Sequence, residues 1–373
     1  MKIAFAIVTL FSAGGLQRDC MAIASRLMAR GHEVTIFAER KKGEIPEGLH
    51  VELLPNRAFS NHRRDLTFAE AVVERCEGRF DRVVGFGKLL GLDVLYCADP
   101  CLAARRVGWL AKWSARRRIQ LLLEADSFRQ GQKTACMLLS ENQARDFRSV
   151  WSTEPDRITI LPPTIDPGRR HAEYRTDGTR ERLREGLGIA ATDQLWLAIA
   201  NQPSVKGLDR TLTALKESGS ARLVIAGIKQ GTKQAGQVLS WARGVSVADR
   251  VQLLGFRADI PELMAAADLL LHPARYDTTG TVILESLING LPVITTAECG
   301  YAPHVVKAKA GQVISTPFTQ EALTAALAAA APDSQRDRWS ANGIAYGVAE
   351  DLYRGLDRAA DIIENPERLT AGR

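Results

Sequence analysis

The stretch HPARYDTTGTVILESLINGLPVITT, residues 272–296, decides how the second half of this chain folds. The apolar run Leu269–Leu271 predicts a buried strand, and the loop after it ends at the carboxylate of Asp277. A glycine turn then opens a short helix with a second carboxylate, Glu285, and a Gly-Leu-Pro turn leads to the next strand. In an open α/β sheet such loops lie outside the carboxyl ends of the strands, where ligands bind. Two carboxylates beside a helix start suit a polyhydroxyl ligand with phosphate, because carboxylates accept hydrogen bonds from hydroxyls and the helix N-terminus attracts anions.

Outward from this stretch, short apolar runs alternate with helical patterns through both halves of the chain. The strands predicted in the first half are Lys2–Val8, His32–Phe37, Val51–Leu54, Asp81–Phe86, Val94–Cys97, Ala135–Leu139 and Ile158–Leu161. Those in the second half are Leu195–Ile199, Arg222–Ala226, Val251–Leu254, Leu269–Leu271 and Val293–Thr295. Helical patterns between them include Leu16–Arg30, Thr67–Cys76, Leu208–Glu217, Gln234–Ala242, Ile260–Ala267 and Val282–Asn289. This alternation predicts an α/β protein with two Rossmann-like, doubly wound parallel sheets.

The length of 373 residues also suggests two domains. The stiff, polar stretch LPPTIDPGRR, residues 161–170, suits a linker between them. We therefore expect a first domain at residues 1–168 and a second at residues 169–349.

Composition narrows the class of protein. With 46% hydrophobic and 25% charged residues, the chain has the make-up of an ordinary soluble globular protein. The N-terminal run predicts a first strand rather than a signal peptide, because a glycine turn and an amphipathic helix follow it at once. No apolar run reaches the roughly 20 residues of a membrane span. Six scattered cysteines in apolar contexts indicate reduced, buried thiols of a cytoplasmic protein rather than a metal site. The formal charge of +6 points to an acidic partner: a nucleotide donor, an anionic membrane surface or nucleic acid.

Two further loops follow predicted strands and open helices. At Gly14-Gly15 the backbone can come close to a ligand and present unpaired N–H groups to an anion, although such a turn alone is as often structural. The pattern is not Gly-x-Gly-x-x-Gly, so the dinucleotide fingerprint is absent. In the second half, NQPSVKGLDR, residues 201–210, places Lys206 at a helix start, where the dipole disfavours a cation. We interpret that mismatch as functional, because a lysine there can neutralise a diphosphate.

These motifs carry a family resemblance. Residues 272–296 resemble the paired-acid signature of the retaining GT-B glycosyltransferases of family 4. The loop GGLQRD, residues 14–19, and the segment GFGKLLGLDV, residues 85–94, resemble the lipopolysaccharide core glucosyltransferase I branch of that family. The resemblance covers nearly the whole chain. It implies GT-B architecture, with two Rossmann-like domains facing an interdomain cleft and a last segment, residues 350–373, packing back on the first domain.

The resemblance also implies roles for single residues. Asp277 would orient the transferred sugar, Glu285 would hold the ribose, and Lys206 with the Gly14 and Gly15 amides would stabilise the departing diphosphate. The implied catalytic residues are Asp277, Lys206, Glu285 and Asp99, the last contacting a sugar or acceptor hydroxyl, with a structural cap as the alternative. The implied donor-binding residues are Gly14, Gly15, Asp19, Lys206, Arg257, Thr279, Gly280, Thr281 and Glu285. The implied acceptor-side residues are Asn61, His62 and Lys88.

Three positions depart from the family pattern. Asp277 stands where most members have Glu, Val205 stands in place of a second basic residue, and Gly87 removes an amide side chain. Arg257 or Arg275 could help to hold the diphosphate instead.

Other residues near these loops have two readings. Phe256, in the loop that flanks the nucleotide base in the family, is equally consistent with plain core. For His272 the expected outcome is a satisfied structural histidine. Tyr301 and His304 resemble the family's Cys-Gly-Tyr-Ala-His loop beside the transferred sugar, with Pro303 displacing the histidine by one place.

Basic residues concentrate between Cys101 and Lys133. Eight bases and two acids give this stretch a net charge of +6, which equals the formal excess of the whole chain. A basic helix with tryptophans suits docking on an anionic leaflet, where each cation contributes about 1 kcal/mol. The residues expected to dock are Arg105, Arg106, Trp109, Lys112, Trp113, Arg116, Arg117 and Arg118. The alternative is a solvated helix whose tryptophans face the core; nucleic-acid binding is a third reading, but no recognised module accompanies the patch.

Residues and resemblance together predict a glycosyltransferase, cytoplasmic and peripheral on the inner membrane. It would move a hexose, with UDP-glucose as the expected donor, to an inner-core sugar of lipopolysaccharide without metal or other cofactor, and the resemblance implies retention of configuration. Its partners would be the nucleotide-sugar, a lipid-anchored oligosaccharide acceptor and the anionic inner-membrane surface, with no nucleic acid. A family 4 transferase using galactose, mannose or galacturonic acid for another envelope glycan remains an alternative, as does an inactive nucleotide-sugar-binding protein.

Overall fold

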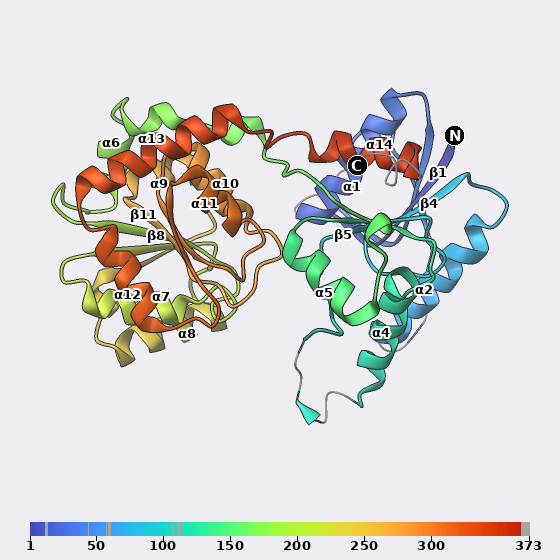
Figure 1. Ribbon diagram of the computed structural model, residues 1–373, viewed down its shortest axis with the longest axis horizontal. Coiled ribbons are helices and arrows are strands. Elements are labelled where there is room, and N and C mark those ends of the chain that lie inside the picture. The colour runs from blue at the N-terminus through green and yellow to red at the C-terminus, as the bar shows by residue number, and fades with distance from the viewer. Residues whose placement is uncertain are drawn as a thin grey trace. The chain divides into compact units, whose positions relative to one another are not determined.

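The computed structural model describes residues 1–11, 14–43, 45–56, 58, 61–105, 108–109 and 113–366, and it divides into two compact units (Figure 1). The first unit is Met1–Thr164 together with the described residues from Tyr353 onward, and the second unit is Ile165–Leu352. Each unit contains one sheet in which every pair of neighbouring strands is parallel. The prediction of two doubly wound parallel sheets is therefore confirmed.

The first sheet has seven strands in the order β3-β2-β1-β4-β5-β6-β7. The strands are β1 Lys2–Phe11, β2 Glu33–Lys42, β3 His50–Leu53, β4 Arg82–Gly85, β5 Val94–Cys97, β6 Ala135–Leu138 and β7 Ile158–Ile160. The helices of this unit are α1 Gly15–Ala29, α2 Asn61–Cys76, α4 Ala115–Phe128, α5 Glu141–Trp151, the 3-10 turn η1 Pro155–Arg157 and α14 Gly355–Glu364.

Successive side chains of β1 are buried on opposite faces of the sheet, which explains why helices cover both faces. Ile3, Phe5 and Ile7 are buried in one apolar cluster with α1 and α14, whereas Ala4 and Ala6 are buried in a second cluster with α2, α4 and α5. Successive side chains of a strand point to opposite faces, so a strand buried on both sides must be apolar throughout.

The last helix of the chain, α14, packs on α1 within the first unit. Its apolar face buries Leu356, Ala360 and Ile363 in the same cluster as α1. Arg26 Nε donates to Asp357 at 2.7 Å and His32 Nε2 lies 2.7 Å from Glu364. Because these ion pairs are partly exposed, the buried apolar face contributes most of the stabilisation.

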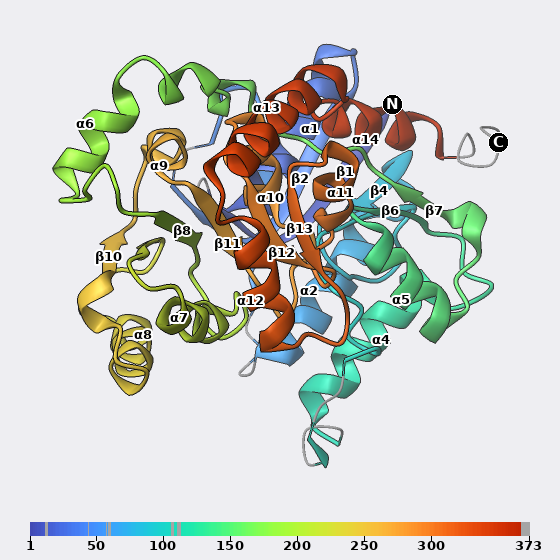
Figure 2. The same cartoon turned by 60° about the vertical axis from the view of Figure 1, so that its left-hand side comes forward.

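The second sheet has six strands in the order β10-β9-β8-β11-β12-β13. The strands are β8 Leu195–Ile199, β9 Arg222–Ala226, β10 Val251–Gly255, β11 Leu269–His272, β12 Val293–Thr296 and β13 Gly311–Ile314. The helices are α6 Thr179–Gly186, α7 Leu208–Glu217, α8 Lys233–Gly244, α9 Ile260–Ala266, α10 Thr281–Ile288, α11 Ala302–Ala308, α12 Gln320–Ala329 and α13 Asp333–Ala349. Short 3-10 turns complete it: η2 Pro167–Arg169, η3 Ala172–Arg175 and η4 Ala248–Arg250. In both views α13 runs beside α10 (Figure 2).

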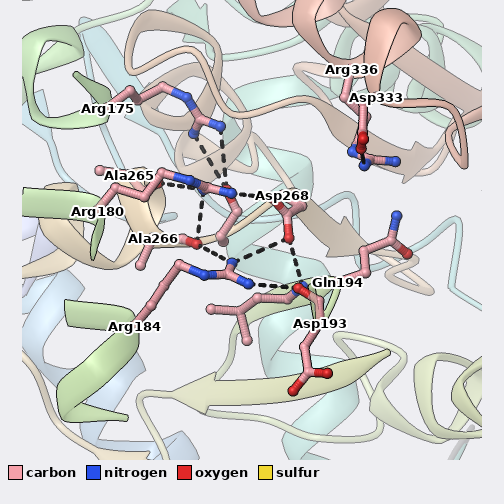
Figure 3. Close-up of polar contacts among 12 residues, drawn as sticks. Arg175, Arg180, Arg184, Asp193, Gln194, Ala265, Ala266, Asp268, Asp333 and Arg336 are labelled. Atoms are coloured by element: carbon pink, nitrogen blue, oxygen red, sulfur yellow. Dashed lines mark hydrogen bonds and ion pairs between the residues drawn. The ribbon is translucent and has the colours of Figure 1, made fainter. Parts of the chain in front are cut away.

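A cluster of three arginines fixes the start of the strands that carry the site (Figure 3). Arg175, Arg180 and Arg184 donate to the carbonyl oxygens that end α9, at 3.0, 2.9 and 3.0 Å respectively. Asp268 accepts from Arg180 at 2.5 Å and from the backbone N–H of Leu195 at 2.7 Å. The arginines are favourable at the end of α9 because cations compensate the negative end of a helix dipole. Through Asp268 the same cluster connects α6 and α9 to the first residues of β8 and β11.

Both sheets change direction beside their first strand. The chain passes from β1 outward to β3 and then returns to β4 on the other side of β1, and β8 and β11 repeat this pattern. At such a switch point the loops after the two central strands diverge and leave room for a ligand. The loops singled out from sequence, after β1, β4, β8 and β11, are the ones at these two points.

Candidate active site

The second unit has a pocket of about 380 Å³ at the carboxyl ends of β8 and β11. We call it the second-unit pocket. Its lining residues come from the last residues of β8 and β11, the loops after β8, β9, β10 and β11, and the start of α10: Ile199, Ala200, Asn201, Lys206, Gly227, Phe256, His272, Asp277, Thr279, Thr281 and Val282. Four of the predicted site residues, Lys206, Asp277, Thr279 and Thr281, are thus brought together.

Asp277 is the centre of this pocket's polar contacts. Its Oδ2 accepts from Lys206 Nζ at 2.5 Å and from His272 Nε2 at 2.9 Å. Burial alone would raise the pKa of Asp277, but the His272 hydrogen bond and the Lys206 charge lower it to about 2. The carboxylate is therefore ionised and held between two basic groups.

Two close backbone approaches set this geometry. Gly207 has φ +71° and a Cβ there would lie 2.0 Å from the carbonyl oxygen of Pro273, so glycine lets the Lys206 loop press against the loop after β11. Arg275 then clamps the two loops, with its guanidinium on both carboxylate oxygens of Asp209 at 2.7 and 2.6 Å. On the other side, Asp277 N–H donates to Glu298 at 3.3 Å, and Gly300 N–H donates to Asp277 at 3.0 Å.

His272 belongs to the site more closely than the sequence suggested. It is 2% exposed, and its ring hydrogen-bonds both Asp277 and Cys299. Burial would lower the pKa of His272, but these two hydrogen bonds raise it to about 9. Its place directly after a buried strand and five residues before Asp277 was the signal available in the sequence.

The loop after β10 presents an aromatic ring, not a second cation. Phe256 is 74% exposed and lines the pocket, so the reading of Phe256 as plain core is wrong. Arg257, predicted to bind the donor, instead bonds both carboxylate oxygens of Asp259 and is not among the pocket's lining residues. Arg275 is likewise paired, with Asp209.

Glu285 lies on α10 one turn after Thr281 and does not line the second-unit pocket. Its Oε1 is 3.8 Å from Arg169 Nε, in the segment that precedes η3. The buried amide of Asn289 fixes this segment by donating to Arg169 O at 2.8 Å and accepting from His171 N–H at 2.7 Å. Gly280, with φ +78°, caps the start of α10.

Tyr301 and His304, which follow β12, are not part of the second-unit pocket. His304 Nδ1 is 2.6 Å from the hydroxyl of Tyr346, and burial lowers the pKa of His304. Tyr301 stacks edge-on against His304. Neither residue lines the second-unit pocket.

The first unit has its own pocket, of about 530 Å³, at the carboxyl ends of β1, β4 and β5. Its lining residues include Lys88, predicted on the acceptor side, and Asp99, predicted to contact a sugar or acceptor hydroxyl, together with Gln17, Gly87, Arg105 and Gln120. Asn61 and His62 begin α2, and their side chains lie outside the described residues.

Lys88 is not a free cation in this first-unit pocket. Its Nζ donates to Glu124 at 2.5 Å and to the carbonyl oxygen of Pro100 at 2.6 Å. Glu124 is fully buried and also accepts from the backbone N–H groups of Leu102 and Ala103 at 2.7 and 3.0 Å, and from Trp151 Nε1 at 2.9 Å. Burial would raise the pKa of Glu124, but Lys88 and these hydrogen bonds lower it. No role for Glu124 was predicted from the sequence. Its place as one of only two acids in the basic stretch between Cys101 and Lys133 was a signal that it forms an ion pair.

The glycine loop after β1 opens α1 as predicted. Gly14 is the N-cap of α1, and within the described residues no side chain caps this helix start. Asp19, one turn into α1, accepts from the Tyr96 hydroxyl at 2.8 Å. Burial raises the pKa of Asp19 above its usual value.

The basic stretch contains α4 and the segment before it. Trp109 and Trp113 are 73% and 74% exposed, so for these two residues the alternative of core-facing tryptophans is wrong. Arg116 and Arg118 are exposed, whereas Arg117 donates to the carbonyl oxygen of Leu102 at 3.0 Å and braces the loop. Arg106 and Lys112 lie outside the described residues.

Predictions from the sequence also concerned cysteines, a metal site and membrane spans. Each of the six cysteines is buried and unpaired. In the part of the chain that is described, no group of three or more His, Cys, Asp or Glu side chains is placed to hold a metal ion. No described helix is both long and apolar enough to cross a bilayer.

Comparison with known proteins agrees with this architecture. The family described as glycosyl transferases group 1 matches residues 179–346, and the family described as Glycosyltransferase Family 4 matches residues 13–169. Lipopolysaccharide glucosyltransferase WaaG of Escherichia coli (strain K12) is 38% identical over 97% of this chain and 98% of its own length. The crystal structure of WaaG, a glycosyltransferase involved in lipopolysaccharide biosynthesis, matches with a TM-score of 0.86 over 97% of this chain and 100% of that chain.

A more distant structure shares the fold alone. HepE of Anabaena, solved in complex with UDP-glucose, has a TM-score of 0.70 and 17% identity, and the match covers 98% of this chain and 99% of HepE. Two parallel-sheet units, two matching family descriptions and a whole-length relative lead to one conclusion: this chain belongs to the GT-B glycosyltransferases of family 4.

Proposed function

We propose that this protein transfers glucose from UDP-glucose to an inner-core sugar of lipopolysaccharide, with retention of configuration, at the cytoplasmic face of the inner membrane. The observation that carries the proposal is the second-unit pocket. It presents an ammonium group, an ionised, partly buried carboxylate, two threonine hydroxyls and an exposed aromatic ring to one volume. These are the groups that a diphosphate, a sugar and a base need. The 38% identity to a lipopolysaccharide glucosyltransferase over nearly the whole chain supports the choice of donor and acceptor.

In this proposal the second-unit pocket binds the donor. Lys206 has three N–H donors, of which one serves Asp277, so the others can reach the diphosphate and stabilise it as it departs. Asp277 accepts hydrogen bonds from the hydroxyls of the transferred sugar. Thr279, Gly280 and Thr281 contact the donor at the start of α10, and Phe256 supplies an apolar surface for the base. Glu285, held near Arg169, binds the ribose.

The first-unit pocket binds the acceptor in this proposal. Asp99 is exposed beside it and can accept from an acceptor hydroxyl, while the Lys88–Glu124 pair shapes its wall. Gly14, Gly15 and Asp19 carry the donor-contact role proposed for the loop that opens α1. Transfer needs no metal in this scheme, because lysine and backbone N–H groups stabilise the leaving diphosphate.

The acceptor is lipid-anchored, so the enzyme must meet it at a membrane. Trp109 and Trp113 are exposed, and so are the cations that flank them in the chain, Arg105, Arg116 and Arg118. Such a surface fits an anionic leaflet, since tryptophan prefers the interface and cations are attracted to acidic headgroups. α4, which carries part of it, projects from the body of the first unit in both views.

The first test is a melting-temperature panel with UDP, UDP-glucose, UDP-galactose, UDP-galacturonic acid and GDP-mannose. A ligand that binds only the folded protein raises the melting temperature. The proposal expects the largest shift with UDP and UDP-glucose and its loss in Lys206→Ala. A preference for another donor would replace the sugar but keep the fold and the roles.

Activity is tested next, by donor cleavage and transfer to inner-core oligosaccharide. Binding of UDP without donor cleavage would favour an inactive nucleotide-sugar-binding protein. If no nucleotide shifts the melting temperature, the proposed function is overturned. Binding to DNA or RNA that falls steeply with salt would favour a nucleic-acid-binding protein instead.

A further inference from the structure

The charge of the second-unit pocket depends on one histidine. Among the residues that line this pocket, Lys206, Asp277 and His272 are the titratable ones. Lys206 and Asp277 form an ion pair and cancel each other. The pocket is therefore neutral if His272 is neutral and carries one positive charge if His272 is an imidazolium.

Nearby arginines do not supply that missing charge. Arg275 is paired with Asp209, and Arg257 is paired with Asp259. Val205, next to Lys206 in the chain, is uncharged. A diphosphate with two or more negative charges would thus meet little net attraction from Lys206 alone, because Asp277 lies 2.5 Å from the same ammonium.

The surroundings of His272 favour the imidazolium. Nε2 donates to the ionised Asp277, and the ring also hydrogen-bonds Cys299. The groups that face the ring are thus Asp277 from the loop after β11 and Cys299 from the loop after β12, while Lys206 reaches the same carboxylate oxygen as the ring. Backbone hydrogen bonds of Asp277 with Glu298 and Gly300 hold the two loops together, and the His272 ring between them is buried.

We propose that His272 is a positioning residue that acts as an imidazolium: it compensates Asp277, leaves the charge of Lys206 available to the donor's diphosphate, and orients the Asp277 carboxylate toward the sugar. Both side-chain donors act on Oδ2, so within the described residues Oδ1 is the oxygen left to the substrate. This inference rests on the proposed donor-binding function of the pocket. It predicts a charge-dependent effect on diphosphate binding, which a purely structural histidine would not produce.

The test compares UDP with its two parts, uridine and inorganic pyrophosphate, each measured by calorimetric titration. His272→Asn should weaken UDP and pyrophosphate roughly tenfold, because one positive charge near a diphosphate is lost at an effective dielectric constant of about 20. Uridine affinity should stay within about twofold. The matched control is His171→Asn, which removes a histidine that pairs with Glu173 outside the pocket. Equal losses for UDP and uridine would overturn the proposal.

A direct measurement follows the protonation of the ring by NMR of histidine-labelled protein, with the His272 signals assigned from their loss in the variant. The pKa of His272 is raised to about 9, so the imidazolium should persist at pH 8, and UDP affinity should fall as the pH rises through about 9. In Asp277→Asn the ring should lose its proton at a lower pH. A neutral ring at pH 7 in the unaltered protein would contradict the inference, whatever the nucleotide panel shows.

Cys299 is the remaining titratable group against the ring, and the His272 hydrogen bond lowers the pKa of this thiol although burial raises it. An ionised Cys299 would cancel the imidazolium charge. Cys299→Ser, which cannot ionise near neutral pH, should therefore leave UDP affinity unchanged. A marked gain in UDP affinity in Cys299→Ser would show that the thiolate offsets His272, and would overturn the net positive charge. If His272→Asn does not fold, His272→Gln and the NMR titration decide the question.

Discussion

The two pockets of this protein lie at equivalent places in their sheets but are built in different ways. The second-unit pocket takes its central charges from two loops, one around Lys206 and one from His272 to Asp277. The first-unit pocket is assembled from β1, α1, α2, the loops after β4 and β5, and α4. A switch point opens a crevice in both sheets, so the strand order explains the place of each pocket.

The charge arrangement differs as well. In the second unit the paired charges line the pocket, and Lys206 and His272 both contact one carboxylate oxygen of Asp277. In the first unit Lys88 lines the pocket, but its partner Glu124 is fully buried behind the wall and joins Lys88 to the segment that precedes α4. We therefore expect the Lys88–Glu124 pair to fix the shape of the first-unit pocket and the Lys206–Asp277 pair to act on the ligand of the second-unit pocket. The predictions below separate these two roles.

The largest effect is expected at Glu124. Replacing it by Ala leaves Lys88 and two backbone N–H groups without their acceptor, and breaking a buried ion pair costs about 3–5 kcal/mol. Urea unfolding should show this loss, while an exposed control at the start of α5, Glu141→Ala, should change stability by less than about 0.5 kcal/mol. If Glu124→Ala unfolds like the control, the wall role of the pair is wrong.

Asp277→Ala comes next, and its effect should appear in turnover. Loss of the group that orients the sugar should lower kcat by about 100-fold, with a small change in UDP affinity. Glu285→Ala should show the opposite pattern, with weaker UDP binding and a smaller change in kcat. Steady-state kinetics with UDP-glucose and calorimetry with UDP provide both numbers; an exchange of the two patterns would reverse the assigned roles.

The docking surface is expected to give a smaller, salt-dependent effect. Arg116→Glu combined with Arg118→Glu should weaken binding to vesicles with 30% acidic lipid, since each cation contributes about 1 kcal/mol near such a surface. Donor hydrolysis in solution should be unchanged. Arg117→Glu is the contrasting variant: its guanidinium braces Leu102, so it should also lower the melting temperature. Vesicle binding that is unaffected by the double substitution would end the docking proposal.

Phe256→Ala should give the smallest effect. The exposed ring offers one apolar face to the base, and aromatic contacts of this kind contribute about 0.5–1.5 kcal/mol. UDP and uridine affinity should therefore fall by about three- to tenfold together, while pyrophosphate affinity is unchanged. This pattern is the reverse of that expected for His272, so the two variants together assign the base and diphosphate ends of the pocket.

A charged histidine also has a consequence for stability. Because the folded pKa of His272 is raised from 6.5 to about 9, its contribution to the free energy of unfolding is complete below pH 6.5 and is lost as the pH rises through about 9. Urea unfolding of the protein and of His272→Asn at pH 6 and pH 9.5 should differ more at the lower pH. An equal difference at both values would mean that folding does not shift the pKa of His272.

Much of the fold could be predicted from the sequence because a parallel strand buried on both faces must be continuously apolar. β5, β8 and β9 begin and end at the predicted residues for that reason. β13, Gly311–Ile314, was missed because a four-residue edge strand with two nonapolar residues has no distinctive pattern. The long β1 and β2 continue past their predicted C-terminal ends because they pair with each other through nine residue pairs, and the pattern of one strand alone does not show its pairing partner.

The candidate site likewise has features that could be predicted from the sequence and features that only the tertiary structure shows. The sequence and the family resemblance together predicted Lys206, Asp277, Thr279 and Thr281 as site residues, and all four line the second-unit pocket, because the loops and the helix start that carry them lie at a switch point. Only the tertiary structure decided that Glu124 receives Lys88, that Arg257 and Arg275 are neutralised, and that His272 shares an oxygen with Lys206. Those facts depend on distances between residues 36 to 71 positions apart or on the direction of one side chain. Ionisation follows from such distances, so the sequence determined which residues are present, and the packed structure determined their charge.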